Sequence, residues 1–210
     1  MKVIINCAAS VDGKIALPIR RQTRISSEED MGRVHRLRAS VDAVLVGVGT
    51  IISDDPKLTV KKEYAVGKNP IRVVLDTKLR TPENAMVLND MAPTIIFNAI
   101  KYGRYGNAEL VKCPENHGLI DLDCVLSELE KRGVKILMVE GGGTVIWEFL
   151  RQRQADELNV FLGDMVIGGR NSPTIADGEG AKNMEEIVKL EFIEAKRMGE
   201  GLLIRYKIIK

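Results

Sequence analysis

Short apolar runs rich in β-branched residues alternate along this chain with segments of helical periodicity. The alternation places the chain in the α/β class, because strands joined by helices form a largely parallel sheet. Several of the runs are apolar at every position, as in central strands that are covered on both faces. We expect strands over residues 3–8, 43–48, 71–75, 94–97 and 136–139.

Helix signals lie between these runs. Ser26 and Glu29 have the spacing of a capping box and precede apolar residues at helical intervals. Asp121 is placed to cap a second amphipathic helix, and Gly133 is expected to end that helix in a left-handed conformation.

The C-terminal part has a different pattern. Strands are expected over residues 157–162, 188–196 and 202–209, and Gly199-Glu200-Gly201 indicates a hairpin turn between the last two. A hairpin pairs its strands antiparallel, so the sheet is expected to be mixed. Because no linker, repeat or low-complexity tract interrupts the chain, we expect a single domain over residues 1–210.

Composition excludes several classes of protein. A formal net charge of +2 does not favour a nucleic-acid partner. Cys7, Cys113 and Cys124 form neither a disulfide framework nor a CxxC pair, so we interpret them as small buried apolar residues in a reducing compartment. With two histidines in the chain, no metal site is expected. Neither a signal peptide nor a membrane span is apparent, so a cytoplasmic protein without a membrane partner is expected.

The segment 140–144 (EGGGT) lies between a predicted strand and a predicted helix. Consecutive glycines there would let the backbone approach a ligand, and the N–H groups at the start of the helix suit a phosphate or pyrophosphate. The segment is neither a GxGxxG fingerprint nor a Walker loop. A tight strand-to-helix turn is therefore an equally good interpretation.

Polar groups follow two other predicted strands. Thr50 and Asp54 follow the second strand, and Thr77, Lys78 and Arg80 follow the third. Ligands of α/β sheets bind at the carboxyl ends of the strands. The cations beyond the third strand suit the 2′-phosphate that distinguishes NADPH from NADH. Solvated turns are the alternative interpretation of both segments.

The first predicted helix carries two further candidates. Arg38 lies one turn beyond Val34, at the border of the apolar stripe, and His35 lies on the same helix. A charge on a helix is usually solvated, and a histidine is more often a hydrogen-bonded structural residue than a catalyst.

Six segments in order resemble the reductase family of riboflavin biosynthesis, which includes stand-alone archaeal and fungal proteins and the reductase half of the bacterial deaminase–reductase. The resemblance covers nearly the whole chain. The matching segments are 10–14 (SVDGK), 35–42 (HRLRASVD), 46–50 (VGVGT), 54–59 (DDPKLT), 69–76 (NPIRVVLD) and 140–144 (EGGGT).

The resemblance implies a dihydrofolate-reductase-like fold: a mixed, mostly parallel sheet flanked by helices, with a C-terminal antiparallel hairpin, commonly assembled as a homodimer. It implies NADPH as the cofactor, with NADH as the alternative. The implied cofactor contacts are Thr50, Asp54, Asp76, Thr77, Lys78, Leu79, Val111, Gly141, Gly142, Gly143 and Thr144. The implied substrate contacts are Gln22, Arg24, Arg38, Leu58, Lys61 and Glu140.

The implied activity is NADPH-dependent reduction of the ribosyl group of 2,5-diamino-6-ribosylamino-4(3H)-pyrimidinone 5′-phosphate to the ribityl form. The basic substrate residues would hold the phosphate, and Glu140 would bond the pyrimidine. No catalytic acid is assigned, because nothing selects one among Asp12, Lys14, His35 and Glu140. Asn6 stands where bacterial members often have a lysine, so a mechanism with that lysine as proton donor does not apply to this chain.

Two other functions remain open. A pterin reductase of the dihydrofolate reductase type would share the fold but would not need cations around a monophosphate. A non-catalytic module that senses NADPH would bind the cofactor without oxidising it. The zinc-binding signature of the deaminase half is missing, so deamination is expected to require another protein.

Overall fold

In the computed structural model, which describes residues 1–19 and 23–210, the chain forms two compact units. Unit 1 comprises Met1 and His35–Met138, and unit 2 comprises Lys2–Val34 and Val139–Lys210. Helix α1 (Glu28–Ser40) and strand β9 (Ile136–Gly141) each run from one unit into the other. In the part of the chain that is described, no helix is both long and apolar enough to cross a membrane.

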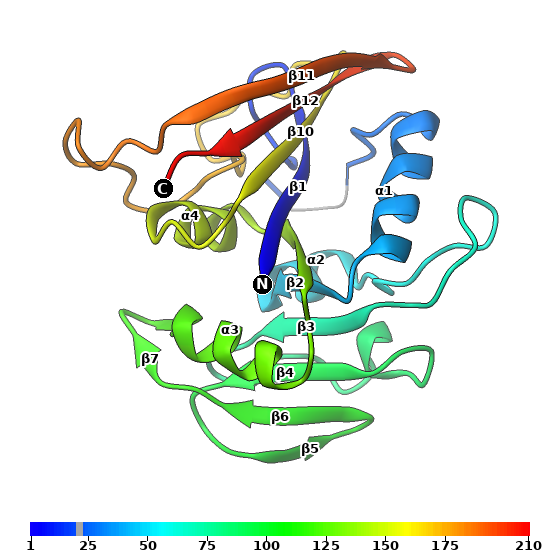
Figure 1. The fold of residues 1–210 in the computed structure, drawn as a ribbon, viewed down its shortest axis with the longest axis vertical. Helices are drawn as coiled ribbons and strands as arrows, with labels where there is room; N and C mark the ends of the chain where they lie inside the picture. Colours follow the sequence, from blue (N-terminus) through cyan, green and yellow to red (C-terminus); the bar gives the residue numbers. More distant parts are fainter. Residues whose placement is uncertain (20–22) are drawn as a thin grey trace. The chain divides into compact units, whose positions relative to one another are not determined.

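Unit 1 contains a mainly parallel group of strands (Figure 1). Strands β2, β3, β4 and β6 pair in parallel, and the short β5 pairs antiparallel with β6. Every residue of β2 and of β4 is buried, as expected for central strands covered on both faces. The elements of this unit are β2 (Ala43–Gly47), α2 (Val48–Asp54), β3 (Ile71–Leu75), the 3-10 turn η1 (Met86–Leu88), β4 (Thr94–Asn98), β5 (Gly103–Tyr105), β6 (Ala108–Lys112), β7 (Glu115–Asn116), β8 (Leu119–Ile120) and α3 (Leu122–Lys131).

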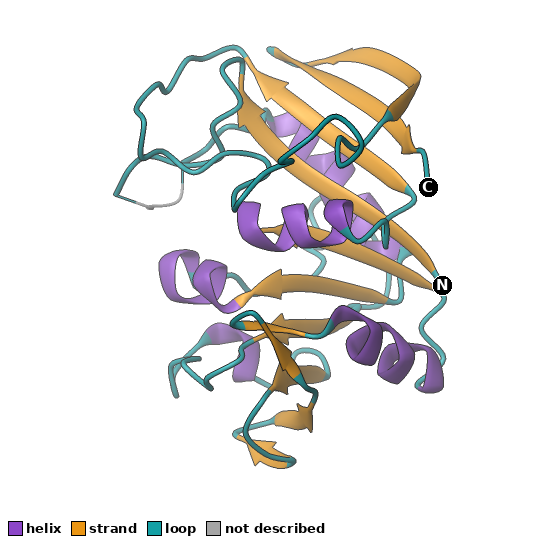
Figure 2. Ribbon diagram, turned by 90° about the vertical axis from the view of Figure 1, so that its left-hand side faces the viewer, coloured by secondary structure: helices purple, strands orange, loops and turns teal. Residues whose placement is uncertain are grey.

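Unit 2 combines one parallel strand pair with an antiparallel C-terminal part. Strand β1 (Lys2–Ser10) pairs in parallel with β10 (Glu157–Gly163), which pairs antiparallel with β12 (Gly201–Ile208). The outermost strand, β11 (Leu190–Met198), forms a long hairpin with β12 (Figures 1 and 2). Helix α4 (Gly143–Arg151) follows β9 directly. The buried side chains of Phe161, Met198 and Leu203 pack together under the hairpin.

The expected helix termini are partly confirmed. The Asp121 carboxylate accepts the N–H of Cys124 at 2.8 Å, and Gly133 adopts φ +81°, so both ends of α3 are as predicted. At α1 the predicted capping box is wrong by one residue. Ser27, not Ser26, accepts the N–H of Asp30, and Glu29 instead accepts the N–H of Gly199, in the hairpin turn.

The pairing of the strands confirms the mixed sheet and the C-terminal hairpin that the sequence predicted. Gly199 occupies the turn between β11 and β12 with φ +61°. Six short elements were not predicted: the helix α2, the turn η1 and the strands β5, β6, β7 and β8. The division into two compact units does not test whether the chain behaves as one domain, which stays a prediction.

The interpretation of the cysteines is wrong for two of the three. Cys113, just after β6, and Cys124, in the first turn of α3, form a disulfide with their Cα atoms 5.9 Å apart. The eleven-residue separation gave no sign of this, because the intervening β7–β8 hairpin folds the chain back on itself. Cys7 is free and buried, as predicted. Cysteine usage therefore no longer argues for a reducing compartment, since disulfides are rare in the cytosol of most organisms.

Candidate functional site

The predicted cofactor residues of unit 1 lie along one edge of its sheet. The register aligns Gly47 with Leu75, Leu75 with Phe97, and Phe97 with Val111, so the carboxyl ends of the four parallel strands lie at the same edge. Thr50 lies in the first turn of α2, just beyond β2, and Asp76 directly follows β3. Val111 is the second-last residue of β6 and is buried.

The turn after β3 is shaped by Asp76, which is fully buried. Its carboxylate accepts the N–H of Arg80 at 2.9 Å, and the N–H and hydroxyl of Thr81, both at 2.7 Å. Leu79 takes a left-handed conformation with φ +51° within this turn. Asp76 therefore stabilises the turn, because its carboxylate accepts three hydrogen bonds from residues of the turn itself.

The groups that the turn presents outward are a hydroxyl and two cations. Thr77 is half-buried, and its hydroxyl lies 3.4 Å from the carbonyl oxygen of Gly118. Lys78 and Arg80 are exposed. A hydroxyl beside an ammonium and a guanidinium is a suitable donor set for a phosphate dianion.

The two aspartates at the C-terminal end of α2 have different environments. Asp54 is half-buried, and this burial raises the pKa of its carboxyl, while a hydrogen bond from Ser53 opposes the shift. Asp55 has φ +41°, and its carboxylate accepts the N–H of Met86 at 2.7 Å. Asp55 is thus a structural residue that joins α2 to η1, whereas Asp54 has no such role.

Three predicted substrate residues lie together in unit 1. Arg38, on α1, donates a hydrogen bond from Nη1 to the carbonyl oxygen of Thr59 at 3.2 Å. Leu58, next to Thr59, is 2% exposed and left-handed with φ +52°. Lys61, two residues beyond Thr59, is exposed. Arg38 thus contacts the segment that carries Leu58 and Lys61, and the binding role of the three residues stays a prediction.

The glycine-rich turn of unit 2 joins β9 to α4. Gly141 and Gly142 have φ angles of +129° and +83°, which other residues rarely adopt. At Gly143 a Cβ atom would collide with the carbonyl oxygen of Thr174 and lie 2.7 Å from the Asp177 carboxylate. Gly143 is therefore required by a close approach of the protein's own chain. Thr174 and Asp177 were not anticipated, because only the fold brings them to this turn.

Two of the remaining predicted residues of unit 2 flank the glycine-rich turn. Thr144 is exposed in the first turn of α4, and Glu140 is half-buried in β9. Arg24 is exposed and pairs with Glu28 at 2.6 Å. Gln22 lies outside the described residues.

The Asp12 carboxylate is held by donors of the protein's own chain. Its carboxylate accepts the Ser10 hydroxyl at 2.6 Å and the backbone N–H groups of Ile167 and Gly168 at 3.0 and 2.7 Å. The hydrogen bond from Ser10 makes the largest contribution to lowering the pKa of Asp12 from 3.8 to about 2. Its three hydrogen bonds give Asp12 a structural role between the loops that follow β1 and β10.

Asn6 stands where bacterial members of the resembled family often have a lysine. The cation beside Asn6 is Arg33, which lies on helix α1. The buried amide oxygen of Asn6 accepts a hydrogen bond from Nη1 of Arg33, on α1, at 2.7 Å, and Arg33 pairs with Asp30 at 2.7 Å. Beside them, burial raises the pKa of the Cys7 thiol to about 12. Cys7 is therefore an unreactive thiol.

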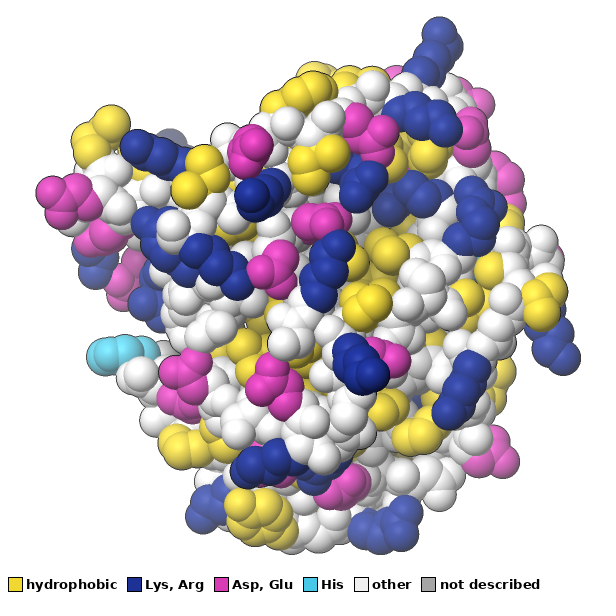
Figure 3. All heavy atoms as spheres, viewed as in Figure 1, with side chains coloured by type: hydrophobic (Ala, Val, Ile, Leu, Met, Phe, Trp, Pro, Cys, Tyr) yellow, Lys and Arg dark blue, Asp and Glu magenta, His cyan; other side chains and the backbone are white. Residues whose placement is uncertain are grey.

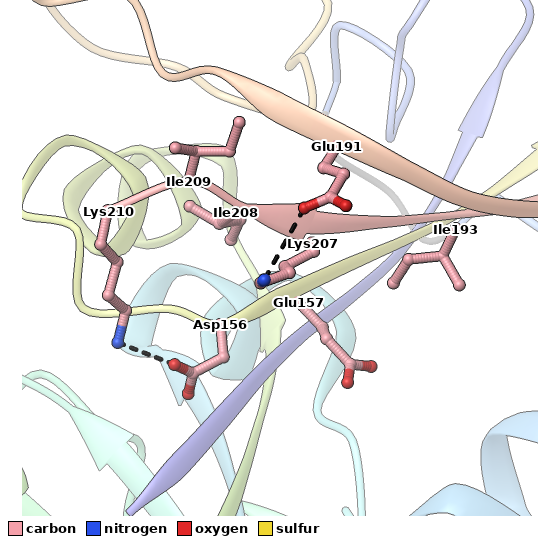
Figure 4. Close-up of a pocket in the computed structure, with 8 residues that line it drawn as sticks. All are labelled: Asp156, Glu157, Glu191, Ile193, Lys207, Ile208, Ile209 and Lys210. Carbon is pink, nitrogen blue, oxygen red and sulfur yellow. Dashed lines mark ion pairs between the residues drawn. The ribbon is translucent and has the colours of Figure 1, made fainter.

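A hollow of about 500 Å³ lies on the C-terminal strands of unit 2 and contains none of the predicted site residues (Figure 4). Four of its charged groups pair with one another, since Lys210 lies 2.7 Å from Asp156 and Lys207 lies 3.7 Å from Glu191. The fifth, Glu157, pairs with Lys2 and Arg205 outside the lining. In the described residues, no group of three or more His, Cys, Asp or Glu is placed to hold a metal ion.

Comparison with known proteins gives consistent matches along the chain. The RibD C-terminal domain family matches residues 1–204. Two relatives carry the name 2,5-diamino-6-ribosylamino-4(3H)-pyrimidinone 5′-phosphate reductase. The relative from Methanothermobacter thermautotrophicus is 40% identical over 211 residues, which cover 98% of this chain and 97% of the relative. The relative from Archaeoglobus fulgidus is 42% identical over 214 residues, which cover 96% of this chain and 95% of the relative.

Solved structures support the fold. RibD from Acinetobacter baumannii has a TM-score of 0.85 at 20% identity over the whole of this chain, which spans 58% of that protein. Dihydrofolate reductase from Enterococcus faecalis, solved with NADP(H), has a TM-score of 0.56 at 9% identity and is covered over 97% of its length. At these identities the likeness concerns the fold alone, and it confirms the predicted dihydrofolate-reductase-like architecture.

Proposed function

Because this chain belongs to the RibD C-terminal domain family, we propose that it reduces the ribosyl group of 2,5-diamino-6-ribosylamino-4(3H)-pyrimidinone 5′-phosphate to the ribityl form with NADPH. The observation that carries this proposal is its similarity, at 40% identity and along 98% of its length, to a reductase of that name. The resemblance noted in the sequence is thereby confirmed.

The donor groups in each unit suit a nicotinamide dinucleotide. At the strand edge of unit 1, Thr77 and Lys78 would meet the 2′-phosphate, which favours NADPH over NADH. In unit 2, the first-turn N–H groups of α4 at Gly143 and Thr144 have no acceptor within the helix and suit a pyrophosphate. When bound, the nicotinamide would supply a hydride to C1′ of the substrate once cleavage of the C1′–O4′ bond, with a proton passing to O4′, has opened the ribosyl ring to an imine. The imine nitrogen would then take a proton from water.

The protein's own contribution is to bind and orient the substrate. Arg38 and Lys61 would hold the 5′-phosphate, and the buried Leu58 fixes the segment that carries Lys61. Arg24 and Glu140 are also proposed as substrate contacts, with Glu140 bonding the pyrimidine. This division agrees with a reaction in which the cofactor performs the chemistry and the protein provides alignment and charge complementarity.

We also propose that the protein acts in the cytoplasm as a homodimer, without nucleic-acid or membrane partners. Cations and carboxylates are interspersed on the face shown in Figure 3, unlike the one-sided basic surface of a nucleic-acid-binding protein.

The test is the loss of reduced-nicotinamide absorbance when the ribosylaminopyrimidine phosphate is added to the purified protein. NADPH and NADH are tried separately, and dihydrofolate serves as an alternative substrate. We expect turnover with the pyrimidine phosphate and a lower KM for NADPH than for NADH. Cofactor binding without oxidation would support a sensing module instead, and turnover of dihydrofolate alone would support a pterin reductase.

The phosphate assignment is tested by replacing Arg38. Because charge-assisted hydrogen bonds contribute about 1.5–3 kcal/mol, Arg38→Ala should raise the KM for the pyrimidine phosphate ~10- to 100-fold and leave the KM for NADPH unchanged. Arg36→Ala is the matched control, since Arg36 is an exposed arginine on the same helix. Equal kinetics in the two variants would contradict the assignment.

A further inference from the structure

The second half of α1 holds the backbone of the segment 58–64 through two side chains, both within unit 1. Arg38 donates to the carbonyl oxygen of Thr59 at 3.2 Å. One turn earlier, Nδ1 of His35 accepts the backbone N–H of Lys61, also at 3.2 Å. Consecutive parts of the segment are thus fixed by an arginine as donor and a histidine as acceptor.

The contact with Lys61 defines the state of the His35 ring. A nitrogen that accepts a hydrogen bond carries no proton, so the ring is neutral with its proton on Nε2. The ring is 1% exposed and stacks on Tyr64, with centroids 5.1 Å apart and planes inclined by 6°. His35 therefore contacts the segment twice, through the backbone of Lys61 and through the Tyr64 ring.

The Tyr64 ring also faces the ammonium group of Lys61. The Lys61 nitrogen lies 5.7 Å from the Tyr64 ring centroid and 3.7 Å from a Glu63 carboxylate oxygen, while its side chain is 56% exposed. The Lys61 ammonium is thus accessible to a ligand, and the Tyr64 ring lies beside it. The other end of the segment is anchored by the buried Leu58.

We propose that His35 is a positioning residue for the substrate: its neutral imidazole fixes the Lys61 N–H and the Tyr64 ring so that the Lys61 ammonium meets the substrate phosphate. This inference rests on the proposed function, which assigns Lys61 to the substrate. His35 does not touch the substrate, and it acts through Lys61.

Three variants separate the hydrogen bond from packing. His35→Phe keeps a ring that can stack on Tyr64 but removes the acceptor. His35→Asn loses the ring but places an amide oxygen near the position of Nδ1. Lys61→Ala removes the ammonium and keeps the backbone N–H. Each is analysed by steady-state kinetics with the pyrimidine phosphate and NADPH, and by thermal unfolding to confirm folding.

We expect His35→Phe to raise the substrate KM about 5- to 10-fold, the worth of one hydrogen bond, with kcat and the KM for NADPH unchanged within about twofold. His35→Asn should restore the substrate KM to within about threefold of wild type. Because His35 acts through Lys61, the double variant with Lys61→Ala should be no worse than Lys61→Ala alone. If His35→Phe does not fold, His35→Gln takes its place in the comparison with wild type. The longer glutamine side chain carries its amide beyond the position of Nδ1, so it also removes the acceptor of the Lys61 N–H.

An unchanged substrate KM in an enzyme that turns over would overturn the inference, as would a parallel loss of kcat or additive effects in the double variant. No turnover by the wild-type protein would overturn the proposed function, and this inference with it. The two failures are therefore distinguishable.

Discussion

Asp12 connects two loops of unit 2 through its ionised carboxylate. It follows β1, and the backbone N–H groups that it accepts, at Ile167 and Gly168, follow β10. These strands are parallel neighbours, with Ser10 aligned to Gly163. The carboxylate thus fixes the chain just beyond the carboxyl ends of both strands.

The Asp12→Asn variant should lose stability in a pH-dependent manner. The folded-state pKa of about 2 lies below the ordinary 3.8, so ionised Asp12 stabilises the folded protein above about pH 4, and this contribution disappears as the pH falls toward 2. The difference in Tm between wild type and variant, followed by circular dichroism, should therefore shrink from pH 7 to pH 2.

Asp164→Asn is the matched control, because Asp164 is an exposed aspartate in the same loop after β10. It should unfold as wild type does. A Tm difference for Asp12→Asn that does not vary with pH would show that the lost contacts do not depend on the charge.

Two glycines in helices predict opposite effects of the same substitution. A Cβ at Gly143 would collide with Thr174, whereas a Cβ at Gly49, in α2, would meet nothing within 4 Å. Gly143→Ala should destabilise the protein by ~1–3 kcal/mol through overpacking. Gly49→Ala should stabilise it by ~0.5–1 kcal/mol, because alanine loses less conformational freedom in a helix. Urea unfolding measures both, and equal effects would mean that the segment around Thr174 can move away from α4.

At the scale of elements, the disulfide joins β6 to α3 across the β7–β8 hairpin. This hairpin reaches the predicted cofactor edge, since the Thr77 hydroxyl contacts the carbonyl oxygen of Gly118 within it. The link closes a loop between residues eleven positions apart. Such a loop restricts the unfolded chain by an entropy worth roughly 2–3 kcal/mol.

The double variant Cys113→Ala/Cys124→Ala should therefore lose roughly 2–3 kcal/mol of unfolding free energy, measured by urea denaturation. Dithiothreitol should lower wild type to the level of the variant and leave the variant unchanged. A thiol titration in denaturant should find only Cys7 before reduction. Three reactive thiols at that point would contradict the disulfide.

Elements governed by local rules were predictable from the sequence. The longer strands, except β6, follow from apolar runs, the α3 cap from Asp121, and the hairpin turn from Gly199. The α1 cap was misassigned because two adjacent serines compete, and the contact of Glu29 with the hairpin turn at Gly199 is not local. The disulfide was missed for the same reason, since only the folded chain brings Cys113 and Cys124 together.

The candidate site residues divide in the same way. Residues that share one strand end or one helix, such as Thr77 and Lys78, were selected as candidates from the sequence pattern alone. Residues that support them from elsewhere in the chain were not found: Asp55 binds the start of η1, and Asp177 lies against Gly143. His35 was seen as a candidate, but its partner Lys61 lies 26 positions away and no local rule pairs them.

At the scale of the whole molecule, the described residues leave the outer strand β11, with its exposed apolar and charged side chains, uncovered. Strand β11 is the outermost strand of unit 2, and eight of its nine residues are exposed. Phe192, Ile193 and Leu190 are 61%, 43% and 39% exposed. Proteins normally cover or charge such an edge, because its free backbone groups and apolar side chains pair with other chains. The proposed homodimer would cover this edge.

Phe192→Glu should convert that dimer into a monomer. A carboxylate buried in an apolar contact has no partner there, so the dissociation constant should rise ~100-fold. Size-exclusion chromatography with light scattering measures the mass, and Met184→Glu is the control because Met184 is 80% exposed outside any strand. The edge is not the interface if Phe192→Glu remains dimeric. If wild type is already a monomer at micromolar concentration, the homodimer itself is wrong, and β11 must be protected in another way, such as by its charged residues Glu191, Glu194 and Lys196.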